Sequence, residues 1–507
     1  MDFLLLWRTY ATPIAVDLGG TARSPAGHRA SQQLGNRLPT FGQQVRTDSA
    51  GDQLTTPAKA ASLLRSRAYL RLLVIAAILG GPISAAAYGY LVGVTKLQDW
   101  LYKDLPHEVG FSSVPFWWPF PLLVIGGIVC AFAIQYLPGT GGHEPADGFK
   151  AGGAPEPNQI LGVALAALAT LSFGAVLGPE APLIALGGGL GAWAVSMARR
   201  GDVDQAKVMV AAAGSFAAIS TLIDSPLVGA FLLMEATGLG GATIQLVLVP
   251  GLLAAGVGAL IFTGLGDWTG LGTFSLSLPG LPHFARPDIA EIGWGLLIGP
   301  AAALLAIGIK RLALLIRPYV QPRRLFLTPV VGLVVAGIAV GFSQATGKAV
   351  SNVLFSGQSE VGPFLSSQAN FTLGAVLLLF ICKAVAYSVS LSSFRGGPIF
   401  PSIFIGAAGG VALSHLPGLP LVPAVAMGIG AMVVGMLRLP LTAVLLAVLL
   451  LSSDSFAVTP LVIISVVTAY VTVLHLDPPP KDQAPEAGTP SKTPEDSAGP
   501  GSAAPTT

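Results

Sequence analysis

The sequence predicts an all-α membrane protein that crosses the bilayer many times through short, broken helices. Hydrophobic residues make up 52% of the 507 residues and charged residues only 10%, far below the roughly 25% of a soluble domain. The mean hydropathy of +0.71 agrees with this. The chain also contains 63 glycines and 40 prolines. Irregular backbone at membrane depth is tolerated only where it is buried in protein or lines a wet cavity, so this composition indicates a polar pathway.

The charges and the metal-binding residue types exclude several other classes of protein. Lysine and arginine number 27 against 25 aspartates and glutamates, a net charge of only +2, which predicts no nucleic-acid partner. Cys130 and Cys382 lie far apart in apolar runs, which argues against a disulfide scaffold or a thiolate metal site. None of the six histidines has another four residues away, so we predict no metal and no cofactor.

Hydropathy divides the chain into three regions. Residues 1–67 form a polar segment, and the basic residues before the first long apolar run favour a cytoplasmic N-terminus. Residues 68–476 form one apolar block, which we expect to lie in the cell membrane as a multi-pass domain. Several of its apolar runs are shorter than the roughly 20 residues of a full span. The tail over 477–507 is rich in Pro, Ser and Ala and is predicted to be disordered.

A repeated pattern of glycines and prolines occurs twice in the apolar block. The stretch G-P-E-A-P covers residues 178–182, and the stretch G-P-I-F-P covers residues 397–401. Each is followed by a glycine five residues after its last proline, Gly187 in the first case and Gly406 in the second. Every fixed position of the second stretch lies 219 residues after its counterpart. A shared offset over four positions indicates a duplicated unit.

A second pair of matching segments supports this duplication. The sequence S-P-L over 225–227 and the sequence L-P-L over 439–441 each lead into an aliphatic run, in the same order as the first pair. We therefore expect two inverted-topology repeats, at about 68–270 and 285–476. Gly- and Pro-interrupted apolar segments at corresponding places in two halves predict a transport site at the repeat interface.

Glu180 is the most informative ionisable residue of the apolar block. A charged residue at the centre of a membrane helix costs about 2.5–3.5 kcal/mol on insertion scales and so requires a reason. Pro179 suits the first turn of a helix, where the N–H groups of Glu180 and Ala181 would be unpaired and would attract an anion. We expect the carboxylate to fill that anion position and to leave it when it is protonated or displaced. The alternative is a glutamate that only stabilises the helix dipole.

Two further segments are candidates for anion binding. In the second half, Ile399 and Phe400 would present their N–H groups at another helix start, whereas Pro398 has none to offer. In the first half, a glycine-rich loop offers the hydroxyl of Thr140 and lets the backbone at Gly141 approach a ligand closely. An ordinary connecting loop is the alternative for this third segment.

These motifs, in this order, resemble those of the chloride channel (ClC) family over about 68–476. The loop around Thr140 is similar to the first signature, G-S-G-I-P, whose hydroxyl faces a central anion site. Residues 178–182 resemble the second, G-[KR]-E-G-P, which contains the gating glutamate. Residues 397–401 resemble the third, G-x-F-x-P, whose amides bind the anion. The segment 225–235 is similar to the family's N-A-P-L-x-G segment and the acidic pair that ends it.

The resemblance agrees with the reading of the residues and identifies Glu180 as the gate. It also implies a homodimer with one pathway in each subunit. The anion-binding candidates are Thr140, Gly141, Glu180, Ala181, Ile399 and Phe400.

Several positions depart from the family pattern. Pro179 replaces the basic residue that precedes the gating glutamate. Glu235 matches the first member of the acidic pair, but Ala236 occupies the place that supplies protons from the inside in coupled exchangers. The helix that carries the family's pore tyrosine has no counterpart, and Tyr470 matches that position poorly.

The predicted function is the passage of chloride or a similar small anion through the bilayer, held by helix N-termini without a full countercharge. Because Ala236 is not an acid, a passive channel gated by Glu180 is favoured. The alternative is a chloride/proton antiporter with Glu235 in the proton path. An intramembrane enzyme would need a cluster of catalytic side chains within the spans, and none is visible, so we predict no enzyme. A cation carrier would need more acidic groups at mid-membrane.

Overall fold

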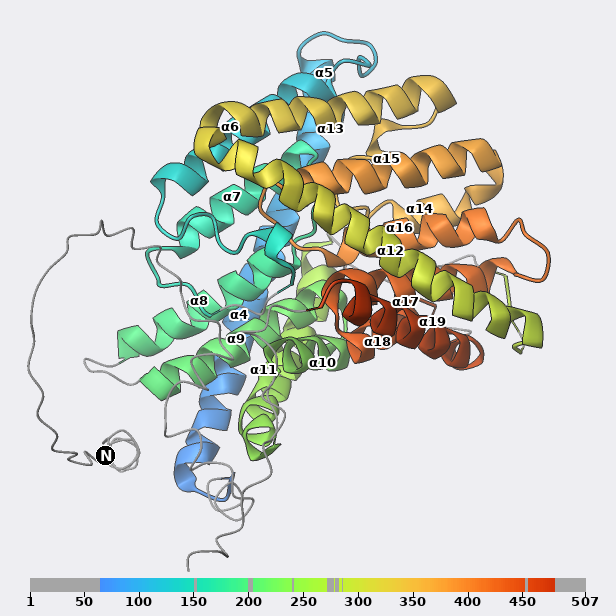
Figure 1. Ribbon diagram of the computed structural model, residues 1–507. Coiled ribbons are helices and arrows are strands. Elements are labelled where there is room, and N and C mark those ends of the chain that lie inside the picture. Colours follow the sequence, from blue (N-terminus) through green and yellow to red (C-terminus); the bar gives the residue numbers. More distant parts are fainter. Residues whose placement is uncertain are drawn as a thin grey trace, which may run out of the picture.

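The computed structural model describes residues 64–149, 153–198, 204–238, 241–270, 278, 282–284, 286–451 and 455–478. Most of the described residues are helical (Figure 1), and the β-type pairing found among them is a single two-residue bridge. Six helical stretches among the described residues are long and apolar enough to cross a membrane, and several shorter apolar helices accompany them. The predicted all-α, multi-pass fold with short helices is therefore confirmed. Nearly all of the polar N-terminal segment and of the tail lies outside the described residues.

The first half contains α4 (Arg67–Asp99), α5 (Leu105–Glu108), α6 (Pro119–Tyr136), α7 (Ile160–Phe173), α8 (Glu180–Ala198), α9 (Asp204–Ile223), α10 (Pro226–Thr237) and α11 (Gly241–Thr269). The second half contains α12 (Ile289–Val320), α13 (Arg324–Thr346), α14 (Val361–Ser366), α15 (Leu373–Leu391), α16 (Ile399–Leu413), α17 (Leu421–Leu437), α18 (Pro440–Leu451) and α19 (Ser455–Leu476). Short turns of other helix types are η1 (Trp100–Asp104), η2 (Pro145–Asp147), η3 (Gln321–Arg323), η4 (Val350–Asn352) and η5 (Gln368–Asn370).

Local sequence signals set several of these helix ends. Asp288 and Glu291 form a capping box at the start of α12, which satisfies N–H groups that have no partner within the helix. α7 ends at Gly174 (φ 108°) and α13 ends at Gly347 (φ 69°). A left-handed residue at a helix end favours glycine, because glycine has no Cβ to clash with the backbone.

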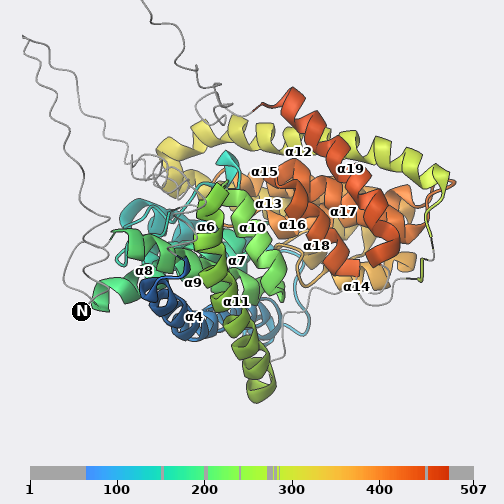
Figure 2. The same cartoon turned by 90° about the horizontal axis from the view of Figure 1, so that it is seen from below.

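The two halves lie side by side and meet through equivalent elements. Figures 1 and 2 place α4 and α7–α11 on one side of the molecule and α14–α19 on the other. α6 of the first half packs on its counterpart α13, and α10 packs on its counterpart α18. A Cβ added at Gly127 would meet the backbone of Pro329, and one added at Gly332 would meet that of Leu123. Such reciprocal contacts between equivalent helices are what a two-fold relation between inverted repeats produces.

Glycines allow the same close helix crossing in both halves. α8 packs on α9 where Gly187 faces Gly214, and α16 packs on α17 where Gly406 faces Gly428. Without Cβ atoms the backbones approach to direct contact, which is the usual way that membrane helices gain van der Waals packing. The repeated glycine at the 219-residue offset therefore has a structural reason in both halves.

This crossing makes a prediction about stability. Gly406→Ala would place its Cβ 2.5 Å from the Gly428 carbonyl oxygen, so α16 and α17 must separate, at a cost of about 1–3 kcal/mol. The matched control is Gly341→Ala in α13, where an added Cβ meets nothing within 4 Å. We expect the melting temperature in detergent to fall for Gly406→Ala and to stay level or rise for Gly341→Ala. Equal melting temperatures for the two variants would contradict the packing argument.

Candidate anion site

The starts of α8 and α16 are held face to face by the backbone. The Gly178 N–H donates to the Gly397 carbonyl over 2.8 Å, and the Gly397 N–H donates to the Gly178 carbonyl over 2.6 Å. This antiparallel bridge joins the two halves immediately before each helix begins. The two motifs that the sequence singled out, 178–182 and 397–401, are therefore neighbours, and both helix N-termini point into one site.

The Glu180 carboxylate lies at the N-terminus of the opposite helix. Its Oε1 accepts a hydrogen bond of 2.8 Å from the Phe400 N–H, and the N–H groups of Ile399 and of Glu180 itself also face the carboxylate. The side chain is fully buried. Glu180 Oε2 is buried and has no hydrogen-bond partner among the described residues. A buried carboxylate oxygen without a partner is costly. The hydrogen bonds of this site therefore satisfy only one of the two Glu180 carboxylate oxygens.

Glycine is required at both ends of the backbone bridge because the Glu180 side chain packs directly on it. A Cβ at Gly178 or at Gly397 would collide with the Glu180 carboxylate. The N–H of Ala181, in the first turn of α8, lies on the same side of the bridge, next to Gly397. The structure thus brings together four of the six predicted anion-binding residues, namely Glu180, Ala181, Ile399 and Phe400.

The remaining two predicted residues, Thr140 and Gly141, lie in the loop that follows α6, where both are next to Arg395. Gly139, Thr140, Gly141 and Gly142 all have positive φ, which is unusual for the threonine at 49°. This loop leads into the short turn η2 and not into a membrane helix. Thr140 is exposed, and its backbone carbonyl, not its hydroxyl, accepts a hydrogen bond from Arg395. Among the described residues Thr140 makes no hydrogen bond to Glu180.

A buried arginine beside this loop was not found by sequence reasoning. Arg395 Nε donates to the Thr140 carbonyl over 3.4 Å, its backbone N–H donates to Thr170 Oγ1 over 3.2 Å, and its side chain is 4% exposed. It lies two residues before Gly397, so the Cα atoms are at most about 7 Å apart. An arginine just outside a G-x-F-x-P-like motif carries no spacing signal by itself. Its importance comes from a partner more than 200 residues earlier in the chain.

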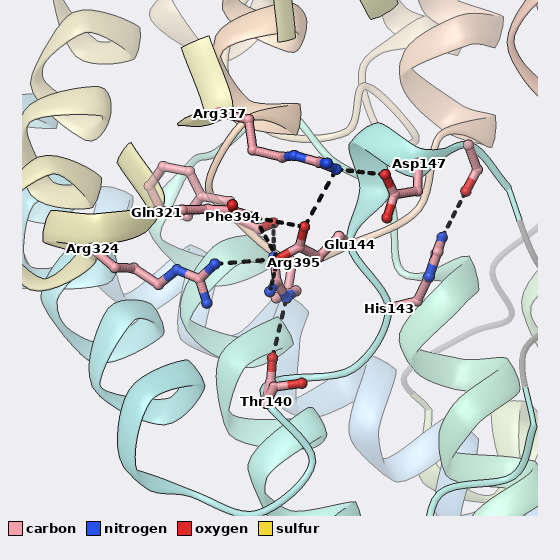
Figure 3. A network of polar contacts seen from close by, with 10 residues as sticks. Thr140, His143, Glu144, Asp147, Arg317, Gln321, Arg324, Phe394 and Arg395 are labelled. Atoms are coloured by element: carbon pink, nitrogen blue, oxygen red, sulfur yellow. Dashed lines mark hydrogen bonds and ion pairs between the residues drawn. The ribbon is translucent and has the colours of Figure 1, made fainter. Parts of the chain in front are cut away.

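That partner is Glu144, whose carboxylate forms ion pairs with three arginines (Figure 3). Its carboxylate lies 3.2 Å from Arg395, 3.2 Å from Arg324 and 3.4 Å from Arg317. Arg317 also pairs with Asp147 at 2.5 Å. Burial alone would raise the pKa of Glu144, but the three guanidinium groups hold this pKa below its usual value. Glu144 therefore stays ionised at neutral pH.

Tyr387 and Lys383 are further buried polar residues near the site. The Tyr387 hydroxyl donates to the Pro398 carbonyl over 3.4 Å, just before α16 begins, and Tyr387 has no exposed surface. One turn earlier on α15, Lys383 Nζ donates to the carbonyls of Leu354 and Phe355 at 2.8 and 3.1 Å. Tyr470, the tyrosine considered from the sequence, is half-buried on α19 and does not take this place.

Glu235, the predicted proton-path residue, caps the start of α18 in the other half. One carboxylate oxygen accepts from the Leu441 N–H over 2.9 Å, and the other accepts from the N–H and hydroxyl of Thr442 over 2.8 and 2.7 Å. Its own helix α10 is capped by Ser225, whose hydroxyl accepts from Val228. Asp224, the residue before Ser225, is exposed and is not the cap.

The arrangement around Glu180 can hold a small anion through backbone N–H groups without a full positive charge. Two helix N-termini supply partial positive charge, and the buried Glu180 carboxylate lies against the N–H groups of the second one. Among the described residues no group of three His, Cys, Asp or Glu side chains could hold a metal ion. The site therefore has the means to bind an anion weakly enough to release it.

Comparison with known proteins gives consistent matches. The family model for voltage gated chloride channels matches residues 126–474. A protein of Escherichia coli O17:K52:H18 (strain UMN026 / ExPEC) named as an ion-transport protein, YfeO, is 30% identical over 364 residues, which is 70% of this chain and 82% of that protein. A protein of the same name from Shigella boydii serotype 18 (strain CDC 3083-94 / BS512) matches with the same identity and coverage.

Two solved structures share the fold. A slow cyanobacterial Cl−/H+ antiporter gives a TM-score of 0.66 at 17% identity, covering 81% of this chain and 96% of that chain. A CLC-type fluoride/proton antiporter gives a TM-score of 0.61 at 18% identity, covering 82% of this chain and 96% of that chain. At these identities the likeness is one of fold. Taken with the family model, which covers well over half of the sequence, it shows that the chain belongs to the chloride channel (ClC) family.

Proposed function

We propose that this protein carries chloride across the cell membrane through a passive pathway that the Glu180 carboxylate opens and closes. The observation that carries the proposal is the hydrogen bond from the Phe400 N–H to Glu180 Oε1. A carboxylate of one half sits on the helix start of the other half, where an anion would bind. A chloride ion and the carboxylate then compete for the same N–H donors, and protonation of Glu180 favours the chloride.

The environment of Glu235 supports a channel over a coupled exchanger. A proton relay must accept and release protons between water and the next group. Both Glu235 oxygens instead accept hydrogen bonds from the start of α18, and a proton added there would compete with these donors. Ala236, the next residue, cannot take up a proton. We therefore interpret Glu235 as a residue of the first half that caps helix α18 of the second half.

Proton-coupled exchange is the second candidate, and a specific observation favours it. The two solved structures with this fold are described as a Cl−/H+ antiporter and a fluoride/proton antiporter. In an exchanger built on this chain, Glu180 would carry the proton from one face and Glu235 would receive it from the other. The fluoride case also makes anion selectivity a matter for measurement, with chloride as the first ion to test.

The assembly and orientation that we propose are a homodimer, with one pathway in each subunit and the N-terminus in the cytoplasm. The support is the resemblance of the motifs to the family and the basic residues before α4, which the positive-inside rule assigns to the cytoplasmic side.

Replacing the gate should uncouple flux from pH. Glu180→Gln removes the charge and weakens the contact with Phe400 by about 1 kcal/mol, so we expect chloride efflux from proteoliposomes to rise several-fold. Wild-type efflux should increase as the pH falls, whereas efflux through the variant should stay flat. The control is Glu291→Gln, the same change in the first turn of α12, which should keep the wild-type profile. A Glu180→Gln profile that still follows pH would refute the gate.

Proton coupling can be read directly in vesicles of purified protein. We expect a chloride gradient to move chloride without driving protons against their own gradient, because Glu235, the candidate second acid, caps the start of α18 and Ala236 is not an acid. The measurement is the internal pH of vesicles after a chloride gradient is imposed, with a protonophore added as the control. Uphill proton movement would overturn the channel and establish the exchanger.

The assembly is tested by mass. Light scattering or native mass spectrometry of the protein in mild detergent should give twice the mass of the chain, 51.6 kDa. A monomer at every detergent concentration would contradict the homodimer while leaving the site assignment intact.

A further inference from the structure

The ionic cluster beside the anion site consists of Glu144, Asp147, Arg317, Arg324 and Arg395. These residues come from the loop after α6, the end of α12, the start of α13 and the segment before α16. Figure 3 shows the three arginine side chains reaching the Glu144 carboxylate, with Asp147 next to Arg317. Three guanidinium groups face two carboxylates, so the cluster carries one net positive charge next to the proposed pathway.

The Glu144 carboxylate is shared rather than tightly paired. Its three arginine contacts measure 3.2, 3.2 and 3.4 Å, whereas charge-assisted hydrogen bonds usually measure about 2.7–2.9 Å. Gln321, which lies beside the cluster, donates from its neutral amide to the Glu144 carboxylate over 2.9 Å, which is shorter than any of the arginine contacts. The carboxylate thus bridges several donors loosely and makes a close pair with no single arginine.

Arg395 is the fixed part of the cluster, and Glu144 is the part that can move. The Arg395 side chain is 4% exposed, against 26% for Glu144. Arg395 donates to the Thr140 carbonyl, the Phe394 carbonyl and Glu144. A guanidinium group has five N–H donors, so two remain without a hydrogen bond to the described residues. Glu144 can turn toward solvent, whereas Arg395 is enclosed.

The position of Arg395 connects the cluster to the proposed pathway. Arg395 donates a hydrogen bond to the carbonyl of the exposed Thr140. From Arg395 the chain runs through Gly396 to Gly397, which pairs with Gly178 at the Glu180 site. The guanidinium therefore belongs to a residue that lies only two positions before the backbone bridge at the two helix N-termini. A fixed positive charge at an entrance raises the local anion concentration.

We propose that Arg395, supported by Arg317 and Arg324, forms a second anion-binding position, which the Glu144 carboxylate occupies until a small anion from solution displaces it. The inference rests on the proposed function, since it places this position on the same pathway as Glu180. The two carboxylates differ in how they leave. Glu180 is buried against backbone donors and is released by protonation, whereas Glu144 stays ionised among arginines and is released by competition with the entering anion.

A purely structural reading makes a different prediction. If Glu144 only neutralises a buried arginine, its removal leaves an uncompensated charge and destabilises the fold at every halide concentration. If Glu144 occupies an anion position, its removal frees that position. A halide then binds more tightly, because the apparent affinity no longer includes the fraction of time that Glu144 fills the site.

The test is a bromide titration of the full chain in detergent by calorimetry, with a large organic anion holding ionic strength constant. We expect Glu144→Gln to bind bromide about tenfold or more tightly than wild type, as when Glu144 fills the position roughly nine-tenths of the time. The matched control is Asp147→Asn, which removes one negative charge from the same cluster but does not contact Arg395. That variant should bind bromide as wild type does.

Two further variants keep the test decisive. Glu144→Asp retains the charge but shortens the side chain, so it should fold and show an intermediate affinity. The double variant Glu144→Gln with Arg395→Gln removes both charges together and should lose the gain. Equal affinity in wild type, Glu144→Asp and Glu144→Gln would overturn the proposal, and so would an undiminished gain in the double variant. Binding is read here without flux, so a failed efflux assay on Glu180→Gln counts against the proposed function alone.

Discussion

The contact between a first-half carboxylate and a second-half helix start organises this structure. Glu180 can reach the Phe400 N–H only because Gly178 and Gly397 pair through two backbone hydrogen bonds. That pairing in turn requires residues without side chains, since the carboxylate lies directly on both glycines. Burial of the whole assembly removes competing water, so a few N–H groups interact strongly with negative charge. The helix crossings on glycine, repeated in both halves, keep α8 and α16 at the angles that bring their starts together.

Full positive charge and partial positive charge are kept apart in this molecule. At the Glu180 site the donors are backbone N–H groups, which hold the Glu180 carboxylate without a permanent ion pair. The guanidinium of Arg395 lies a short distance away, where Glu144 balances it. Lys383 is likewise turned to the carbonyls of Leu354 and Phe355. Because the donors at the Glu180 site carry only partial positive charge, an anion held between the helix starts in the proposed pathway would be bound weakly enough to leave.

The sequence was sufficient for the parts of the structure that repeat. Hydropathy, glycine and proline content and the 219-residue offset predicted the all-α fold and its two halves, and they singled out the segments around Glu180 and Phe400 that the structure makes neighbours. These features can be recognised in the sequence because the same need for glycine at close backbone contacts occurs once in each half.

The parts that do not repeat could not be predicted in the same way. Glu144 and Arg395 are 251 residues apart, and no spacing rule links a loop glutamate to an arginine outside a motif. The loop at Thr140 starts no helix, because its run of left-handed residues turns the chain away, a property of backbone angles that composition does not give. In the sequence Tyr387 is an aromatic residue within an apolar run, and only the packing of α15 on α16 brings its hydroxyl to Pro398.

The two acids that join the halves have a consequence for how the protein is made. Glu180 and Glu235 belong to the half that leaves the ribosome first, but the N–H groups that satisfy them, on Phe400 and Thr442, are synthesised 220 and 207 residues later. Until then neither carboxylate has its native partners from the second half, and an incompletely satisfied charged group in lipid is costly. The first half therefore cannot complete its folding alone. We expect the insertion machinery to keep these two acids out of lipid until α16 and α18 have been synthesised.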